Sequence, residues 1–439
     1  MLADVLRNLS SSSELVDAFT AAIREGELAP GEPLPSIRSI AHTSGVSPGT
    51  VALAFRIMRD RGIITTAQGR RARVATQPVA QRSVELRIPD DAVNLAVVGP
   101  DPELLPPVNS VLGQQLFRPS LYDVGNVEPH LRSVMTREFA GVGVEGELTV
   151  TNGTLDALER IILARFKPGA SVIVEDPCWS TSLGLLRLTG LNIVGAPVDD
   201  EGITEQGLKA ALESRYISAI LLTPRAQNPY GSALTPGRAA ALRQILDEYP
   251  HVVVIEDDHA GLVCDVPAVT LTGGRNGYAV IRSMNKALGP DLRIAVMMSD
   301  PSTADAVQRR MLLGPGWVSH FVQRLIATML EDPVTISAIN HAREQYASRR
   351  EAFLAALSRH GIHAHGRSGL NVAIPVPDET AAVSRLLIRG WAVRGGTPFR
   401  LSSGPFVRIC TSTLRPDQGE QLAAAIADVL APGRQVATP

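Results

Sequence analysis

Lysine is scarce in this chain. Only three of its 439 residues are lysines, and the other cationic side chains, histidine apart, are arginines. A guanidinium group stays protonated near neutral pH and cannot attack an aldehyde, whereas an amine can. Lys286 stands out because it follows Ser283 by three residues and precedes Arg293 by seven. The pattern indicates an amine kept for chemistry, and a surface lysine beside a loop is the alternative.

Long apolar runs and cysteines are scarce as well. No run is long enough to span a bilayer, and the first residues lack the basic, apolar and small-residue pattern of a signal peptide. Cys178, Cys264 and Cys410 are few, odd in number and scattered. They argue against a disulfide framework or a zinc site and favour a reducing cytoplasm. The length allows more than one domain and a large core.

The small net charge of the whole chain, −2, conceals a basic segment. Residues 33–76 contain seven arginines and one acidic residue, Asp60, which gives a net charge of +6 over 44 residues. Such a local excess predicts a polyanionic partner. A solvated basic face is the alternative.

Helical signals follow one another near the N-terminus. Residues 13–24 have amphipathic spacing, and Ser36 can cap a second, shorter helix that ends at Gly45. Ser47-Pro48 is a strong start for a third helix. Two short helices joined by a glycine turn predict a helix-turn-helix, whose second helix enters the DNA major groove N-terminus first.

A basic hairpin is expected after these helices. Residues 63–66 and 72–74 read as its strands, and its tip carries an arginine pair. Together with the runs 34–41 and 45–51, this segment resembles the winged helix-turn-helix domain of the GntR family. The chain has Pro48 where family members often carry an arginine, and a helical docking domain without DNA is the alternative. The resemblance implies DNA contacts from Ser36, Arg38, Ser47, Gly49, Thr50, Gly69, Arg70 and Arg71.

A long α/β domain is predicted after a linker. We expect a winged helix-turn-helix domain at 1–76, a polar linker at 77–91, and the second domain at 92–439. In that domain apolar strands alternate with amphipathic stretches, which predicts a mostly parallel sheet covered by helices. Two long helices over 319–360 and a small α+β unit over 361–431 should follow. The expected strands are 148–151, 171–175, 219–223, 252–255, 279–282, 294–298, 370–376 and 406–411.

Polar side chains follow several of these strands. Asp257 follows one buried strand, Asn228 another, and Gly153-Thr154 opens a helix after a third. Ligands bind at the carboxyl ends of strands in open parallel sheets, and free N–H groups at a helix start receive phosphate. Each signal alone has a structural alternative: a strand-end acid, a turn opener and a plain helix cap.

Taken with Ser283, Lys286 and Arg293, these positions resemble the pyridoxal-phosphate site of fold type I, the aspartate-aminotransferase fold. The resemblance implies that Lys286 holds the cofactor through a Schiff base and that Asp257 pairs with its pyridine nitrogen. His259 stands where relatives usually have tyrosine. The other implied cofactor contacts are Asn228 and His259 to the phenolic oxygen, Trp179 to the ring, and Gly153, Thr154, Leu155, Ser283, Arg293 and Tyr122 to the phosphate.

Arg408 matches the arginine with which relatives bind a substrate carboxylate, so an amino acid is a plausible ligand. A core tryptophan is the alternative for Trp179. Tyr122 matches a residue that relatives send across a dimer interface.

A GntR-type reader followed by an aminotransferase-like domain resembles the MocR subfamily of transcription regulators. The resemblance implies a homodimer that binds operator DNA and responds to pyridoxal phosphate or its amine adduct. The site motifs look most like those of PtsJ-like members, which are linked to vitamin B6 salvage. Two alternatives stay open: an aminotransferase whose N-terminal domain only docks, and a plain DNA binder whose large domain is an empty scaffold.

Overall fold

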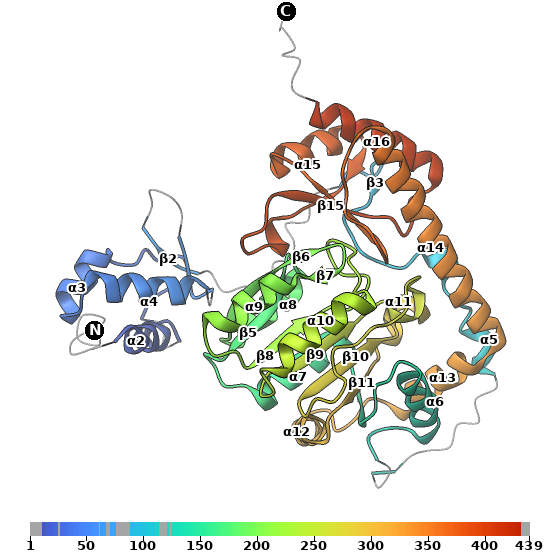
Figure 1. Cartoon of the computed structure of the whole chain (residues 1–439), viewed down its shortest axis with the longest axis horizontal. Coiled ribbons are helices and arrows are strands. Elements are labelled where there is room, and N and C mark those ends of the chain that lie inside the picture. Colours follow the sequence, from blue (N-terminus) through green and yellow to red (C-terminus); the bar gives the residue numbers. More distant parts are fainter. Residues whose placement is uncertain are drawn as a thin grey trace, which may run out of the picture. The chain divides into compact units, whose positions relative to one another are not determined.

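The computed structural model divides into two compact units (Figure 1). One contains residues 1–86 with 167–171 and 181–193, and the other contains 87–166, 172–180 and 194–439. In the described part of the chain, no helix is long and apolar enough to cross a membrane. The structure describes residues 11–24, 27–60, 62–66, 71–75, 88–113, 121–122 and 125–431.

The N-terminal residues form the expected helix-turn-helix and hairpin. The Oγ atom of Ser36 accepts a hydrogen bond from the amide of Ser39, and Gly45 ends that helix with a φ of 75°. The Oγ atom of Ser47 accepts from the amide of Thr50 at 3.1 Å. These caps satisfy amides that the helix itself leaves free. The elements are α2 (Ser12–Arg24), α3 (Ile37–Ser44), α4 (Pro48–Asp60), β1 (Ile64–Thr65) and β2 (Arg73–Val74).

A small core joins these elements. Buried apolar side chains come from all three helices and both strands, and Phe19 meets Phe55 edge to face at 6.3 Å. The strands pair antiparallel, Ile64 with Val74, as a wing requires. Gly69 and Arg70 at the predicted wing tip lie outside the described residues, as do residues 77–87 of the predicted linker.

An eight-stranded sheet has the order β4-β11-β10-β9-β8-β5-β6-β7. It belongs to the second unit apart from residue 171 of β5 and residues 192–193 of β6, which fall in the first unit together with most of the helix at 180–188. Strands β5, β8, β9 and β10 are parallel, while β11 runs antiparallel to β10 and β4, and β7 to β6. The bounds are β4 (Glu147–Thr151), β5 (Ser171–Asp176), β6 (Asn192–Asp199), β7 (Gly202–Ile203), β8 (Ala219–Leu222), β9 (Val253–Asp258), β10 (Tyr278–Ser283) and β11 (Ala295–Ser299).

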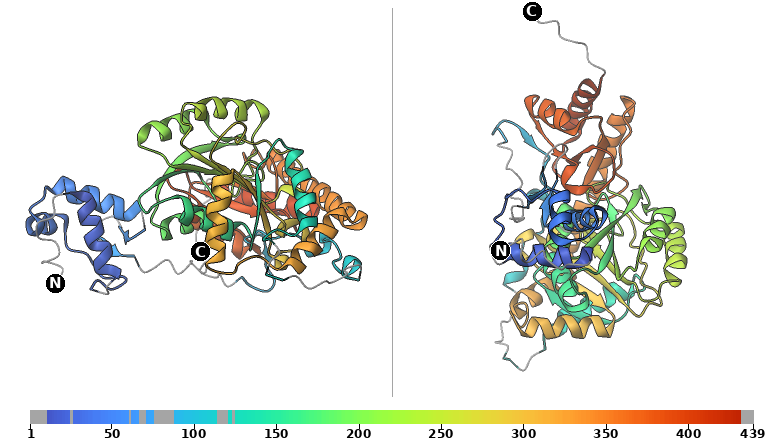
Figure 2. Two further views of the ribbon diagram at one scale, coloured as in Figure 1. Left: turned by 90° about the horizontal axis from the view of Figure 1, so that it is seen from below. Right: turned by 90° about the vertical axis from the view of Figure 1, so that its left-hand side faces the viewer.

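Helices cover both faces of the sheet (Figures 1 and 2). On one face, α9 and α10 bury their apolar sides against β8 and β9. On the other, α7 packs on α12, and both contact β4 and β11. The helices are α5 (Asn109–Leu112), α6 (Pro129–Ala140), α7 (Thr154–Arg165), α8 (Ser180–Leu188), α9 (Glu205–Ser214), α10 (Pro236–Asp247), α11 (Asn285–Leu288), α12 (Pro301–Leu312), α13 (His320–Glu331), α14 (Pro333–Arg359), α15 (Glu379–Ile388) and α16 (Pro416–Leu430).

The long helix α14 leads into the smaller subdomain. Its three-stranded antiparallel sheet has the order β12-β15-β14, and a separate pair joins β13 to β3. Helices α14, α15 and α16 pack around a core that includes Phe353, Val407 and Ile409. The strands are β3 (Val93–Asn94), β12 (Asn371–Pro375), β13 (Trp391–Ala392), β14 (Arg394–Gly395) and β15 (Phe406–Cys410).

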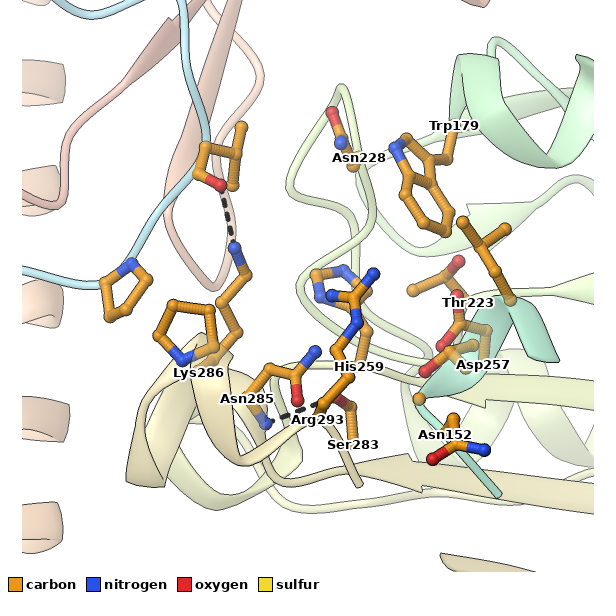
Figure 3. Close-up of a pocket in the computed structure, with 16 residues that line it drawn as sticks. Asn152, Trp179, Thr223, Asn228, Asp257, His259, Ser283, Asn285, Lys286 and Arg293 are labelled. Atoms are coloured by element: carbon orange, nitrogen blue, oxygen red, sulfur yellow. Dashed lines mark hydrogen bonds between the residues drawn. The ribbon is translucent and has the colours of Figure 1, made fainter. Parts of the chain in front are cut away.

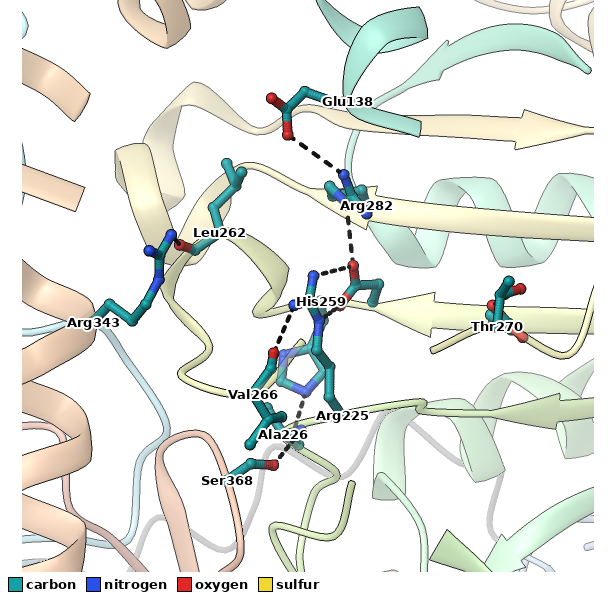
Figure 4. Close-up of polar contacts among 12 residues, drawn as sticks. Glu138, Arg225, Ala226, His259, Leu262, Val266, Thr270, Arg282, Arg343 and Ser368 are labelled. Atoms are coloured by element: carbon teal, nitrogen blue, oxygen red, sulfur yellow. Dashed lines mark hydrogen bonds and ion pairs between the residues drawn. The ribbon is translucent and has the colours of Figure 1, made fainter. Parts of the chain in front are cut away.

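Strand β9 is longer than the sequence predicted. It continues to Asp258, so the carboxylates lie inside the strand instead of after it. Because side chains alternate along a strand, Asp257 points away from the face that holds Glu256 and Asp258. Asp258 stays in register opposite Arg282 of β10, and its carboxylate is held in a buried ionic network with Arg225 and Arg282, which Figure 4 labels.

Asp258 is the centre of that network. Arg225 donates to both of its carboxylate oxygens at 2.9 Å, and Arg282 donates to Oδ2 at 3.1 Å. Asp258 is 2% exposed and Arg282 3%. The guanidinium of Arg282 also lies 4.8 Å from the ring centre of Phe139. Burial works to raise the pKa of Asp258, but the two arginines outweigh it and hold that pKa below its usual value.

Replacing Asp258 with alanine should destabilise the protein strongly, because two buried guanidinium groups lose their counter-ion. The expected loss is about 3–5 kcal/mol in the free energy of unfolding, measured by denaturant titration. Asp305→Ala is the matched control, since it breaks the exposed pair with Arg309 and should leave the unfolding midpoint nearly unchanged. Because the folded-state pKa of Asp258 is depressed, its contribution should be present above the ordinary pKa near 4 and be lost as the pH falls further. Equal effects of the two substitutions would contradict this account.

Candidate cofactor-binding site

A cavity of about 300 Å³ lies at the carboxyl ends of the central strands (Figure 3). Every predicted cofactor contact except Tyr122 lines it. Because these residues come from distant parts of the chain, the sheet is what assembles them. The lining residues that the sequence singled out are Gly153, Thr154, Leu155, Trp179, Asn228, Asp257, His259, Ser283, Lys286 and Arg293.

One end of the cavity has the character of an anion site. Helix α7 begins at Thr154 without a side-chain cap, and Gly153 before it has a φ of 86°. A Cβ atom built on Gly153 would lie 4.0 Å from the Nε atom of Arg293, which itself has an unusual φ of 52°. Ser283 lines the same cavity. Free helix amides beside a guanidinium and a hydroxyl form a donor set suited to a phosphate.

Asp257 presents a carboxylate that forms no ion pair with the residues that the structure describes. It is 4% exposed, and its Oδ1 atom has no hydrogen-bond partner among the described residues. Burial, followed by the neighbouring charge of Asp258, raises the pKa of Asp257 to about 7. An orphaned buried acceptor of this kind fits a cationic N–H donor such as a protonated pyridine nitrogen.

Lys286 reaches the cavity from α11. Its Nζ atom donates to the backbone carbonyl of Val98 at 2.8 Å. Burial lowers the pKa of this amine, and the charge of Arg408 lowers it further. A lowered pKa increases the fraction of neutral amine, which is the nucleophilic form.

His259 is half-buried, and its ring is neutral near pH 7. Burial, then the charge of Lys286, lowers its pKa to about 4. Its Nε2 atom lies 3.0 Å from the carbonyl oxygen of Ala226. A carbonyl can only accept, so Nε2 carries the proton and Nδ1 is an acceptor. His259 could therefore bond a phenolic oxygen only where that oxygen carries a proton, a restriction that the hydroxyl of a tyrosine would not have.

Arg408 lies behind the cavity wall. Its guanidinium donates to the carbonyl of Ala96 and, weakly, to the Oδ1 atom of Asn228 at 3.5 Å. It also packs 5.3 Å from the ring centre of Phe399. Burial lowers its pKa to about 10, and its Nε atom has no partner among the described residues.

Tyr122 lies away from the cavity of its own chain. It is 91% exposed and meets Trp317 edge to face at 5.8 Å. Its predicted role depends on a second chain.

Several lining residues escaped the sequence analysis. Val98 and Pro100 have no motif, because they follow the predicted linker without any periodicity. Thr223 and Asn285 were visible as polar neighbours of a strand end and of Lys286. Glu175 is buried beside them and accepts from the amide of Thr223 at 3.2 Å. Burial raises its pKa to about 8, so it is protonated at neutral pH.

The predicted DNA contacts that the structure describes lie on the surface of the helix-turn-helix. Arg38, Gly49 and Arg71 are exposed, and Thr50 is partly exposed. The hydroxyls of Ser36 and Ser47 are also exposed but already serve as helix caps. A base contact by Ser47 would have to share its hydroxyl with that cap.

The protonation of His259 provides a direct test of the site's electrostatics. Its ring should stay neutral down to a pH of about 4. The folded-state pKa lies below the ordinary value near 6.5, so its contribution to stability should be complete above 6.5 and decline as the pH falls towards 4. Histidine side-chain NMR signals measured against pH would show this, with His259→Asn to assign the resonance. A titration near 6.5 would contradict the neutral ring.

Two family models match the chain. Residues 11–74 match the bacterial regulatory proteins of the gntR family, and residues 129–426 match aminotransferase class I and II. A GntR helix-turn-helix domain implies DNA binding. Among solved structures, the kynurenine aminotransferase of Pyrococcus horikoshii covers 78% of this chain and 91% of its own at 20% identity, with a TM-score of 0.72. At that identity the likeness concerns the fold, which is that of the pyridoxal-phosphate aminotransferases.

Similar proteins with the same architecture include two transcription regulators. The vitamin B6 salvage pathway transcriptional repressor PtsJ of Salmonella typhimurium is 35% identical over 96% of this chain and 98% of its own length. The pyridoxine biosynthesis transcriptional regulator PdxR of Corynebacterium glutamicum is 28% identical over 57% of this chain and 56% of its own. The chain therefore belongs to the GntR-type transcription regulators that carry an aminotransferase-like domain, the MocR subfamily.

Proposed function

We propose that this regulator changes its DNA binding when pyridoxal phosphate, or an adduct of it with an amine, occupies the cavity at Lys286. The observation that carries the proposal is the donor and acceptor set of one cavity. A half-buried lysine amine, an orphaned carboxylate oxygen and a free helix start meet there, in a chain that also has a GntR reader domain.

Each lining residue has a defined part in this proposal. Lys286 would hold the cofactor through its amine, and Asp257 would pair with the pyridine nitrogen. The start of α7, Ser283 and Arg293 would bind the phosphate, and Trp179 would cover the ring face. When bound, pyridoxal phosphate supplies an aldehyde that condenses with amines, with loss of water, and a ring that accepts electrons.

The regulated genes in this proposal belong to vitamin B6 metabolism. Two of the similar regulators, PtsJ and PdxR, are named for vitamin B6 salvage and pyridoxine biosynthesis. A protein that holds the end product of such pathways is well suited to report its concentration. Binding of the cofactor shifts the regulator only if the DNA-bound and free states hold the cofactor with different affinity.

A homodimer is part of the proposal. Tyr122 is 91% exposed beside Trp317, which fits a residue that reaches the phosphate of a partner chain. Two reader domains would then meet a DNA site with matching twofold symmetry.

An aminotransferase is the second candidate. Lys286, Asp257 and Asn228 line one cavity, and Arg408 lies directly behind Asn228, so the groups needed for turnover are intact. The neutral His259 argues against efficient turnover. Its acceptor Nδ1 does not stabilise an ionised phenolic oxygen as a hydroxyl donor does.

The amine of Lys286 should be essential for covalent cofactor attachment. Mixing the protein with pyridoxal phosphate should produce a visible absorption band that Lys286→Ala and Lys286→Arg both lack, since neither has an amine. Asp257→Asn should keep the band but weaken cofactor binding about 10- to 100-fold, through loss of a charged hydrogen bond. A band that persists in Lys286→Arg would contradict the assignment.

The regulatory proposal is tested with DNA from upstream of the protein's own gene. At fixed salt, specific binding should change when pyridoxal phosphate is added, and this change should disappear in Lys286→Arg. Arg38→Ala should weaken binding to all sequences and lower the salt dependence by about one counter-ion. Arg309→Ala, on an exposed position of α12, is the control that should leave DNA binding unchanged. Cofactor attachment and amino-group transfer without any specific DNA binding would favour the aminotransferase.

A further inference from the structure

We propose that residues 96–100 form a strap across the cavity, and that the strap is fully displaced only when the cofactor binds Lys286 and an acidic ligand binds Arg408. This coupling rests on the proposed function, in which Lys286 holds the cofactor. It makes the cofactor and a carboxylate ligand cooperative.

Both ends of the strap are firmly attached. Before it, Leu95 is fully buried, its amide donates to Ala392, and its carbonyl accepts from the amide of Cys410, each at 2.9 Å. After it, the amide of Asp101 donates to the hydroxyl of Tyr346 at 2.9 Å, and Arg349 donates to the Asp101 carboxylate at 2.7 Å. The five residues between these anchors can therefore shift while their ends stay in place.

Two backbone carbonyls hold the strap over the cavity. Val98 accepts from Lys286 and Ala96 accepts from Arg408. The residue between them, Val97, is 65% exposed. This alternation is what an extended segment produces, with residues two apart facing the same side. Val98 and Pro100 also line the cavity, so the strap is a wall of the site.

The contact at Val98 competes with the cofactor. Figure 3 shows the Lys286 amine turned to this carbonyl and away from Asp257 and Asn152, which lie across the cavity. A neutral amine that donates through an N–H keeps its lone pair, but this contact fixes the nitrogen at Val98, away from the place where an aldehyde seated against Asp257 would lie. To react with a cofactor that lies against Asp257, the amine must break its hydrogen bond to the Val98 carbonyl.

The contact at Ala96 competes with a carboxylate. The bonds of Arg408 go to uncharged oxygens, and its Nε atom has no partner among the described residues. A carboxylate accepts two bonds from a guanidinium, and each is about twice as strong as a bond to a neutral oxygen. An acidic ligand therefore displaces the Ala96 carbonyl, and displacement costs less once Val98 has already been released.

The strap can be followed with a fluorophore on Val97→Cys, because the three native cysteines are buried and resist labelling. The labelled full-length protein is titrated with pyridoxal phosphate, then with succinate as a carboxylate that has no amine. Emission should change partly with pyridoxal phosphate and further with succinate, and only slightly with succinate alone. Arg408→Gln should remove the second step, and Lys286→Arg the first.

The anchor at Tyr346 provides a second test. Tyr346→Phe removes the acceptor of the Asp101 amide and loosens the anchor that aligns the Val98 carbonyl with Lys286. The released strap does not need that alignment, so the substitution destabilises mainly the docked arrangement, and the dissociation constant for pyridoxal phosphate should fall about threefold to tenfold. Tyr278→Phe is the matched control, because it also removes a tyrosine hydroxyl, which donates to the carbonyl of Glu145. Tyr278 lies at the start of β10, and the cavity residue Ser283 lies at its other end, so cofactor affinity should stay unchanged.

The outcomes separate the strap from the proposed function. Absorbance reports cofactor attachment independently of the label. Attachment with unchanged emission, or an unchanged affinity in Tyr346→Phe, would overturn the strap alone. Failure of the cofactor to attach would overturn the proposed function, and the strap with it.

Discussion

The paired arginines around Asp258 are the constraint on which the rest of the site depends. They connect the loop after β8, the end of β9 and the end of β10, so three adjacent strands finish in register. Asp257 and His259 flank Asp258, so the ion pairs that fix Asp258 also fix the positions of these two residues. Burial raises the pKa of Asp257 to about 7, and the charge of Asp258 contributes to that rise. The network thus builds a carboxylate that gains most from a cationic partner, which the pyridine nitrogen of the cofactor would supply.

The sequence predicted correctly the features that depend on residues a few positions apart. The caps at Ser36 and Ser47, and the polar residues after buried strands, depend on neighbours within a few positions and appear where expected. Residues 96–100 gave no signal, because their role depends on carbonyls that any residue carries. The position of the Arg408 side chain depends on the small sheet and on its contact with Phe399. The predicted role of Tyr122 depends on a second chain. Such long-range partners leave no spacing pattern to read.

The difference between an enzyme and a sensor rests on small features of the same cavity. Turnover requires an amine that moves freely and a proton-donating partner for the phenolic oxygen. Here the amine of Lys286 donates to the carbonyl of Val98, and the neutral His259 donates its only side-chain N–H to the carbonyl of Ala226. Under the proposed function both features would slow a catalytic cycle, in which the amine must be released and recaptured at every turn, whereas a binding event requires Lys286 to leave Val98 only once. A sensor must hold its ligand and need not transform it, so a cavity that keeps its binding groups without efficient turnover would suit the proposed function.

A strap at this point in the chain also has a consequence for signalling. A ligand can bias DNA binding only through an element that has two arrangements with different affinities for it. The strap begins five residues after the predicted linker, 77–91. Its two arrangements differ by a pair of hydrogen bonds, each contributing about 1 kcal/mol. Two such bonds change an equilibrium roughly thirtyfold, which is within the range of ordinary allosteric coupling, so a contact this small is sufficient to carry the signal.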